Sequence, residues 1–136
     1  MKPKEKLHVV AGLISRGQKV FVAQRGPQQS AAGCWELPGG KVEFGESEQA
    51  ALIRELQEEL CATVTVGGLW GQSQVTVGER SIVMRVFHCQ LLSEVVLTEH
   101  QAQRWIGRAE VEQLHWAPAD VPLLEQLKVW LTGGAD

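Results

Sequence analysis

Three glutamates, Glu55, Glu58 and Glu59, stand close together in a segment whose composition favours a helix. Because an α-helix turns by about 100° per residue, their spacing places all three within an arc of roughly 100°. Like charges at this spacing destabilise a free helix, and negative charge near its C-terminal end opposes the helix dipole. The arrangement therefore predicts a partner that compensates both effects.

Two interpretations of this acidic face are open. It is a solvated surface softened by Arg54 and Lys41, which is common on helices, or its carboxylates hold a hard cation. Magnesium is such a cation, and it keeps several waters and bridges to substrate phosphates. The upstream Pro38-Gly39-Gly40 favours the second interpretation, because glycine lets backbone groups approach a ligand closely. Lys41 then offers a point charge to a phosphate.

The segment from Gly40 to Ala62 resembles the Nudix box, Gx5Ex7REUxEExGU. Five residues separate Gly40 from Glu46, and seven more precede Arg54-Glu55-Leu56-Gln57-Glu58-Glu59, so every charged position matches. The end departs from the pattern, because Cys61 stands at the glycine position and Ala62 at the bulky apolar one. A left-handed residue other than glycine costs about 1–2 kcal/mol. We therefore expect a strained or differently ended helix, with an effect on stability more than on catalysis.

The resemblance implies a set of metal ligands and a cofactor. Glu55, Glu58 and Glu59 would bind Mg²⁺, with Mn²⁺ as an alternative, and Gly39 would add a backbone carbonyl. A divalent cation neutralises the charge of a polyphosphate and lowers the pKa of a water that attacks phosphorus in line. The chemistry implied by the resemblance thus agrees with the clustered carboxylates.

Three further residues would complete the catalytic set. Glu46 and Arg54 would brace the loop–helix–loop geometry, Arg54 by orienting Glu55. Glu99 would supply another carboxylate, as a metal ligand, from a loop opposite the helix. A carboxylate within reach of the attacking water can take its proton, and Glu58 and Glu99 are the candidates for this role.

Outside the box the chain resembles the MutT-type nucleoside triphosphate pyrophosphohydrolases, and in particular the bacterial CTP pyrophosphohydrolase branch. The resemblance covers nearly the whole chain and rests on Val22-Ala23-Gln24-Arg25, Gly33 to Lys41, Glu99-His100-Gln101 and Ala117 to Pro122. It implies cleavage between the α and β phosphorus atoms, which gives a nucleoside monophosphate and pyrophosphate. The implied partner is a small nucleotide.

The resemblance also implies substrate-binding positions. Arg25 would approach the phosphates or the base, Glu36 and Leu37 would line the base pocket, and Lys41 would contact phosphate. Asp120 aligns with the residue that reads the base edge, although it is also a good helix N-cap before Val121-Pro122. A carboxylate reader suits cytosine, 5-methylcytosine, 8-oxoguanine and 2-hydroxyadenine without choosing among them.

Tryptophans offer a second way to bind a base. Trp35 and Trp116 could stack on it, but we favour a place in the core for both. Two alternatives to the triphosphate hydrolase stay open: a Nudix enzyme acting on ADP-ribose or a dinucleotide, and a degenerate Nudix domain that senses a nucleotide without hydrolysing it. The intact charges from Arg54 to Glu59 argue against the sensor, and a structural adaptor would leave them unexplained.

The remaining sequence predicts the elements that position these residues. Residues 7–15 and 19–25 are expected to form a hairpin, followed by a loop at 26–33. A helix should run from its cap at Ser47 to about Leu60, with Leu52, Ile53, Leu56 and Leu60 facing the core. Strands are predicted at 62–66, 69–77, 80–92 and 101–106, with Gly67-Gly68 and Gly78-Glu79 as turns, and a second helix at 120–131. The fold class is α/β, a Nudix-type α/β/α sandwich with a mixed β-sheet between helices, in one domain spanning 1–136.

Composition excludes several other classes. The chain has 136 residues and a net charge of −3 without a basic block, which argues against a nucleic-acid polymer as partner. No apolar run is long enough to cross a membrane, and the basic N-terminal residues lead into a strand rather than a signal peptide. Three cysteines and four histidines are widely spaced, so neither a disulfide framework nor a zinc site is expected. A reducing cytoplasm is the expected compartment, and the oligomeric state is open.

Overall fold

Two long strands, β1 (Glu5–Arg16) and β6 (Arg80–Leu91), run parallel through the centre of the computed structural model, which describes residues 5–134. β5 (Val64–Val77) pairs antiparallel with β6, and β4 (Gly39–Lys41) pairs antiparallel with β1. β2 (Lys19–Gln24) returns from β1 and pairs with β3 (Trp35–Glu36) and β7 (Ala102–Ile106). The sheet is mixed, as the sequence predicted.

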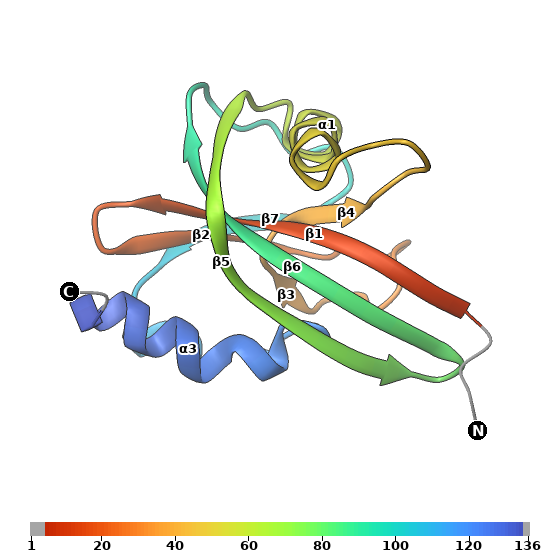
Figure 1. The fold of residues 1–136 in the computed structure, drawn as a ribbon. Coiled ribbons are helices and arrows are strands. Elements are labelled where there is room, and N and C mark those ends of the chain that lie inside the picture. Colours follow the sequence, from red (N-terminus) through yellow and green to blue (C-terminus); the bar gives the residue numbers. More distant parts are fainter. Residues whose placement is uncertain (1–4, 135–136) are drawn as a thin grey trace.

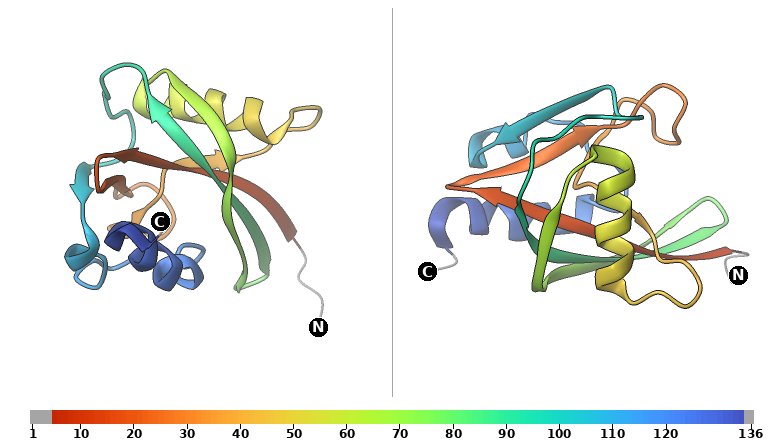
Figure 2. Two further views of the ribbon diagram at one scale, coloured as in Figure 1. Left: turned by 60° about the vertical axis from the view of Figure 1, so that its left-hand side comes forward. Right: turned by 90° about the horizontal axis from the view of Figure 1, so that it is seen from above.

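Helices cover both faces of this sheet. α1 (Glu48–Leu60) lies on one face and α3 (Leu124–Val129) on the other (Figure 1), and Figure 2 shows the same layers from two other sides. α3 continues a 3-10 turn, η1 (Val121–Leu123), and leads into a π turn, η2 (Trp130–Gly134). The short α2 (Arg108–Val111) follows β7. The predicted α/β/α sandwich is therefore confirmed, and no helix within 5–134 is long and apolar enough to span a membrane.

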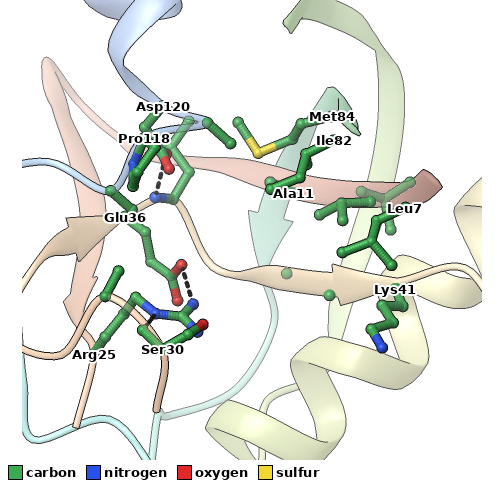
Figure 3. Close-up of a pocket in the computed structure, with 18 of the residues that line it drawn as sticks. Leu7, Ala11, Arg25, Ser30, Glu36, Lys41, Ile82, Met84, Pro118 and Asp120 are labelled. Carbon is green, nitrogen blue, oxygen red and sulfur yellow. Dashed lines mark hydrogen bonds and ion pairs between the residues drawn. The ribbon is translucent and has the colours of Figure 1, made fainter. Parts of the chain in front are cut away.

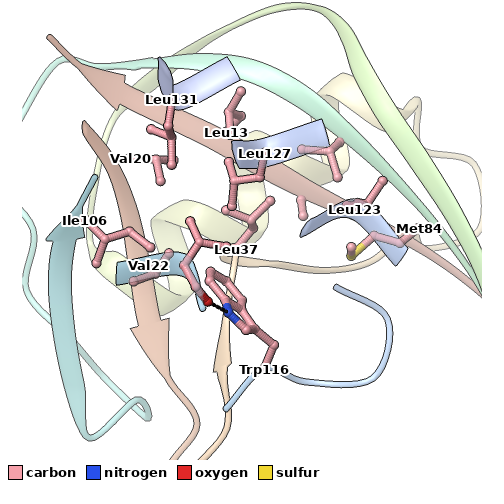
Figure 4. Packing of buried hydrophobic residues seen from close by; sticks show 13 residues of the cluster. Leu13, Val20, Val22, Leu37, Met84, Ile106, Trp116, Leu123, Leu127 and Leu131 are labelled. Atoms are coloured by element: carbon pink, nitrogen blue, oxygen red, sulfur yellow. Dashed lines mark hydrogen bonds between the residues drawn. The ribbon is translucent and has the colours of Figure 1, made fainter. Parts of the chain in front are cut away.

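The hydrophobic core consists of two clusters, one on each side of the sheet. Successive side chains of a strand point to opposite faces, so Val10 and Ile14 of β1 pack toward α1 while Ala11 and Leu13 pack toward α3. The α3 side also contains Val20, Val22, Leu37, Met84, Ile106, Trp116, Leu123, Leu127 and Leu131 (Figure 4). β1 is apolar on both faces because it is covered on both faces.

The helix α1 begins and ends at the predicted residues. The Ser47 side chain accepts a hydrogen bond from the Ala50 N–H at 3.1 Å, which caps the N-terminus. Cys61 ends the helix in the left-handed region, with φ 50° and ψ 32°, and donates its N–H to Gln57 and Leu56 carbonyls. The expected strained end is therefore present. Ile53 was wrongly predicted to face the core, because it is 45% exposed, one position off the buried stripe.

Two other predicted boundaries differ from the structure. Gly67-Gly68 is not a turn but lies inside the continuous β5, where the register shifts between Val66 and Leu69 and again before Gly71. Strands accommodate glycine at such bulges, which bend the strand. The second helix is not uniform, because Pro122 favours a 3-10 start and the last turn widens to π geometry. The predicted turn at Gly78-Glu79 is present.

Candidate active site

A cavity of about 570 Å³ lies between the sheet, α1 and the segment Ala117–Asp120 (Figure 3). Its volume is in the range of pockets that bind small molecules. Apolar side chains of β1 and β6 form one wall: Leu7, Val9, Ala11, Ile82 and Met84. The rest of its lining includes most of the predicted site: Arg25, Glu36, Leu37, Gly39, Lys41, Glu55, Glu59 and Asp120. Segments far apart in the sequence thus meet around one space.

At one end of the cavity, two carboxylates of α1 press against the glycines of β4. A Cβ on Gly40 would overlap the Glu55 carboxylate, and a Cβ on Gly39 would overlap the Val10 carbonyl. Burial raises the pKa of Glu55, and it raises the pKa of Glu59 to about 8, with the charges of Glu36 and Glu55 adding to the second shift. Only glycine permits this approach of helix and strand.

Arg54 braces the loop between β4 and α1. Its guanidinium donates twice to Glu46, with Nε to Oε2 at 2.7 Å and Nη2 to Oε1 at 2.9 Å, and once to the Lys41 carbonyl at 3.0 Å. The bidentate pair lowers the pKa of Glu46 to about 2. Nη1 also faces Glu55 at 3.4 Å and Glu58 at 3.3 Å. The arginine therefore supplies part of the positive charge that the acidic face required.

At the other end, Asp120 and Glu36 carry the polar groups. Asp120 is 3% exposed, and its Oδ2 accepts the Leu37 N–H at 2.9 Å. Burial raises the pKa of Asp120 well above 3.8, and the charge of Glu36 adds to the shift. Glu36 accepts from Arg25 Nη1 at 2.7 Å and pairs with His100 Nε2 at 2.8 Å. Arg25 thus points at Glu36, as Figure 3 shows.

Comparison with known proteins agrees with this geometry. Residues 6–128 match the family model described as NUDIX domain. The chain belongs to this family. It is 43% identical over 120 residues to the CTP pyrophosphohydrolase of Escherichia coli (strain K12), covering 88% of this chain and 89% of that one. It is also 43% identical over 131 residues to the putative 8-oxo-dGTP diphosphatase 2 of Mycobacterium tuberculosis (strain H37Rv), covering 93% and 92%.

The fold of this Nudix hydrolase also matches solved structures. The solution structure of the E. coli ORF135 protein superposes with a TM-score of 0.82 at 40% identity, covering 97% of this chain and 96% of that one. The crystal structure of the MutT protein from Methanosarcina mazei Go1 has the same TM-score at 26% identity, covering 91% and 94%. Sequence and fold therefore lead to the same family.

The donor set of this Nudix domain fits the divalent cation that the family generally uses. Carboxylate and backbone carbonyl oxygens are the ligands that hard cations prefer. Glu59 Oε1 is buried without a hydrogen-bond partner among the described residues. A buried acceptor left unpaired is unfavourable, and a cation would satisfy it. The residues therefore fit a divalent ion, although within 5–134 no three acidic, histidine or cysteine side chains are gathered closely enough to hold one alone.

Four predicted residues of the Nudix site lie outside the cavity lining: Glu46 and Arg54, which brace the loop, and Glu58 and Glu99. Glu58 is exposed, and its carboxylate faces Arg54, because that guanidinium lies one turn away on the same helix. Glu99 is also exposed. Its loop is nevertheless attached to the end of α1, since Thr98 donates its N–H to the Glu59 carbonyl and its hydroxyl to the Glu58 carbonyl, both at 3.1 Å. The structure thus places the Glu99 backbone beside the acidic helix without directing its side chain into the cavity.

The remaining predictions concern Asp120, the tryptophans and His100. Asp120 occupies the cap position of η1, but its side chain makes no capping hydrogen bond, so the capping role was wrong. Trp116 is buried in the core, as expected, and Trp35 is half-buried against the same cluster. His100 is one of the four widely spaced histidines. It is buried, and its contact with Glu36 was not foreseen, because only tertiary structure brings β3 beside residue 100.

Proposed function

We propose that this Nudix hydrolase converts nucleoside triphosphates to nucleoside monophosphates and pyrophosphate, with Mg²⁺ as its ion and Mn²⁺ as a substitute. The substrates we propose are cytidine or oxidised purine nucleotides, namely CTP, 5-methyl-dCTP and 8-oxo-dGTP. One observation carries this proposal: a single cavity is lined both by the half-buried Glu55 and Glu59 of α1 and by the buried Asp120. The names of two relatives, a CTP pyrophosphohydrolase and a putative 8-oxo-dGTP diphosphatase, support the same substrates.

At the phosphate end, Glu55, Glu58, Glu59 and the Gly39 carbonyl would hold the ion, with Glu99 as a further ligand. The ion, when bound, neutralises polyphosphate charge and acidifies water. Arg54 keeps Glu55 in place while Lys41, on the cavity wall, offers a positive charge to the phosphates. Glu58 or Glu99, both exposed, accepts the proton of the attacking water.

At the base end, Leu37 and Asp120 form the wall that meets the base edge. The Leu37 N–H holds one oxygen of Asp120. Burial raises the pKa of Asp120 well above 3.8, so its carboxyl group holds a proton to higher pH than a free aspartate does, and in the protonated form it both donates and accepts hydrogen bonds. Such a group complements a base edge that carries an amino donor beside an acceptor. Glu36, held by Arg25 and His100, supports this wall from the side.

We further infer that residues 1–136 act as one catalytic domain on free nucleotides, rather than on a nucleic-acid polymer, in a reducing cytoplasm. The sheet shared by both core clusters supports the first inference. The net charge of −3 and the three free cysteines support the others. Cys34 and Cys89 are buried.

A nucleotide panel tests the proposal. The purified chain with Mg²⁺ is offered CTP, 5-methyl-dCTP, 8-oxo-dGTP, ADP-ribose and a dinucleoside polyphosphate, and the products are separated. We expect pyrophosphate and a monophosphate from at least one triphosphate. Hydrolysis of ADP-ribose or the dinucleotide, with no triphosphate consumed, would reject the assignment and leave the fold intact.

A single substitution separates an enzyme from a nucleotide sensor. Glu58→Gln should lower the rate by orders of magnitude if Glu58 serves the reaction, while nucleotide binding by calorimetry changes little. Glu125→Gln, an exposed glutamate on α3, is the matched control and should keep the wild-type rate. Equal rates for the wild type and Glu58→Gln would show that Glu58 has no part in the chemistry.

A further inference from the structure

The segment Ala117–Asp120, which carries the base-reading carboxylate of the proposed function, is attached to its surroundings at three points. The Ala117 N–H donates to the Trp35 carbonyl at 2.9 Å, and Asp120 Oδ2 accepts from Leu37 at 2.9 Å. These two bonds join the segment to β3 and the residue that follows it. The third bond comes from the opposite direction, because the Ser73 hydroxyl on β5 donates to the Ala119 carbonyl at 2.7 Å.

Ser73 occupies a protected position. It is 7% exposed, and its partner across the strands is Met84, a residue of the cavity wall. A buried hydroxyl must find an acceptor, and a carbonyl that loses a buried donor is left unsatisfied. The bond is therefore part of the local structure, and it ends one residue before Asp120.

The same strand holds the helix that follows. Gln126 of α3 donates its side-chain amide to the Trp70 carbonyl at 2.7 Å, beside the bulge in β5. A Cβ on Gly71 would lie 3.0 Å from the Gln126 side chain, so the helix and the strand are in close contact. β5 thus holds both the Ala117–Asp120 segment and α3 in place. The glutamates of the acidic face belong to α1 and not to β5.

We propose that Ser73 is a positioning residue for base specificity. Its hydroxyl holds the Ala119–Asp120 peptide so that the Asp120 carboxyl group stays aligned with the base edge, and it makes no contact with the phosphate end. The inference rests on the proposed function. Loss of the hydroxyl should therefore weaken discrimination between bases, whereas the chemical step proceeds almost as before.

Paired substrates test this inference. kcat and KM are measured for CTP against UTP and for 8-oxo-dGTP against dGTP, with the wild type, Ser73→Ala and Ser73→Thr. The discrimination ratio is the kcat/KM of the preferred nucleotide divided by the kcat/KM of the other nucleotide in its pair. In Ser73→Ala we expect this ratio to fall about tenfold through a higher KM for the preferred nucleotide, since one buried hydrogen bond is lost. Ser73→Thr keeps a hydroxyl at a strand position and should restore the ratio.

Controls distinguish a specific role from a structural one. Ser81→Ala removes an equally buried serine at the far end of the β5–β6 hairpin and should leave the ratio unchanged. A Ser73→Ala protein with a lower melting temperature but the wild-type ratio would overturn the inference. Ser73→Cys carries a thiol, which donates more weakly than a hydroxyl, and should also lower the ratio; if the alanine variant does not fold, a wild-type ratio in Ser73→Cys would overturn the inference. A wild type inactive on every triphosphate refutes the proposed function itself, before any variant is compared.

Discussion

Two glutamates of the same sequence motif occupy opposite electrostatic environments. Arg54 lowers the pKa of Glu46 to about 2, so this side chain stays ionised to lower pH than a free glutamate does while it braces the loop. Burial instead raises the pKa of Glu59 to about 8 and leaves one of its oxygens without a partner among the described residues. A charge that is unfavourable in the protein alone is one that a cation would stabilise. The two environments therefore distinguish the bracing role of Glu46 from the ligand role that we propose for Glu59.

The brace predicts the effect of a conservative change. Arg54→Lys keeps the charge but loses the planar fork that contacts Glu46 twice. Because residues that orient ligands typically matter by about 10- to 100-fold, kcat should fall by that factor while KM changes little. Initial rates at saturating Mg²⁺ and triphosphate measure this. An unchanged kcat would show that the loop holds its shape without the fork.

Asp120 predicts a pH dependence of stability. Its pKa is raised well above 3.8, so the unfolded chain releases this proton at lower pH than the folded protein does. The folded state then binds more protons at this site, so the contribution of Asp120 to stability is fully present below about pH 4 and falls as pH rises above it, by at most about 1.4 kcal/mol per pH unit. Urea unfolding at several pH values should show a flatter profile for Asp120→Asn, which can still accept the Leu37 N–H. Parallel profiles for the two proteins would contradict the raised pKa.

At the scale of single elements, α1 combines a good beginning with a strained end. Ser47 caps its first turn, whereas Cys61 adopts φ 50° at its last. The left-handed conformation costs a non-glycine residue free energy because its Cβ crowds the following carbonyl. The strain lies just beyond the acidic residues and touches none of the cavity.

Cys61→Gly should therefore stabilise the protein. Relief of the left-handed strain, partly offset by the greater freedom of glycine in the unfolded chain, gives an expected gain of about 1 kcal/mol in the free energy of unfolding. Denaturant titration measures the gain, and activity should be unchanged. Cys61→Ala keeps a Cβ and serves as the control. A glycine variant no more stable than the alanine variant would refute the account.

The elements also show which features a sequence can predict. α1 was predictable because its cap and its apolar spacing are local signals. The bulge in β5 was not, because a glycine pair is equally compatible with a turn, and only pairing with β6 decides. The same limit applies to the site. The motif indicated which charged residues belong to the candidate site. The pairing of His100 with Glu36 could not be predicted, because these residues are 64 positions apart in the sequence.

At the scale of the whole molecule, the cavity lies between parts that different helices hold in place. Glu55 and Glu59 belong to α1, and Asp120 precedes η1 and α3. Both sides are supported by β1, which is buried on each face by a separate cluster. Binding of an ion at one side of the cavity should therefore raise the stability of the whole fold against unfolding.

Thermal unfolding provides that measurement. A ligand that binds only the folded state raises its stability, by about 2.7 kcal/mol at a concentration 100 times its Kd. Mg²⁺ or Mn²⁺ should raise the melting temperature and EDTA should reverse the rise. Glu59→Gln should abolish the effect, whereas Glu125→Gln, on the surface of α3, should retain it. An equal rise in all three proteins would assign the ion to another place.

Because the acidic residues of the cavity lie on α1 and the carboxyl group proposed to read the base precedes α3, substrate preference could diverge without any change in the reaction. On the proposed assignment, substitutions around residues 117–126 or along β5 would alter which nucleotide fits, and the acidic residues of α1 would stay intact. Evolution can thus retune such a protein from one nucleotide pool to another in small steps, each of which leaves a working enzyme.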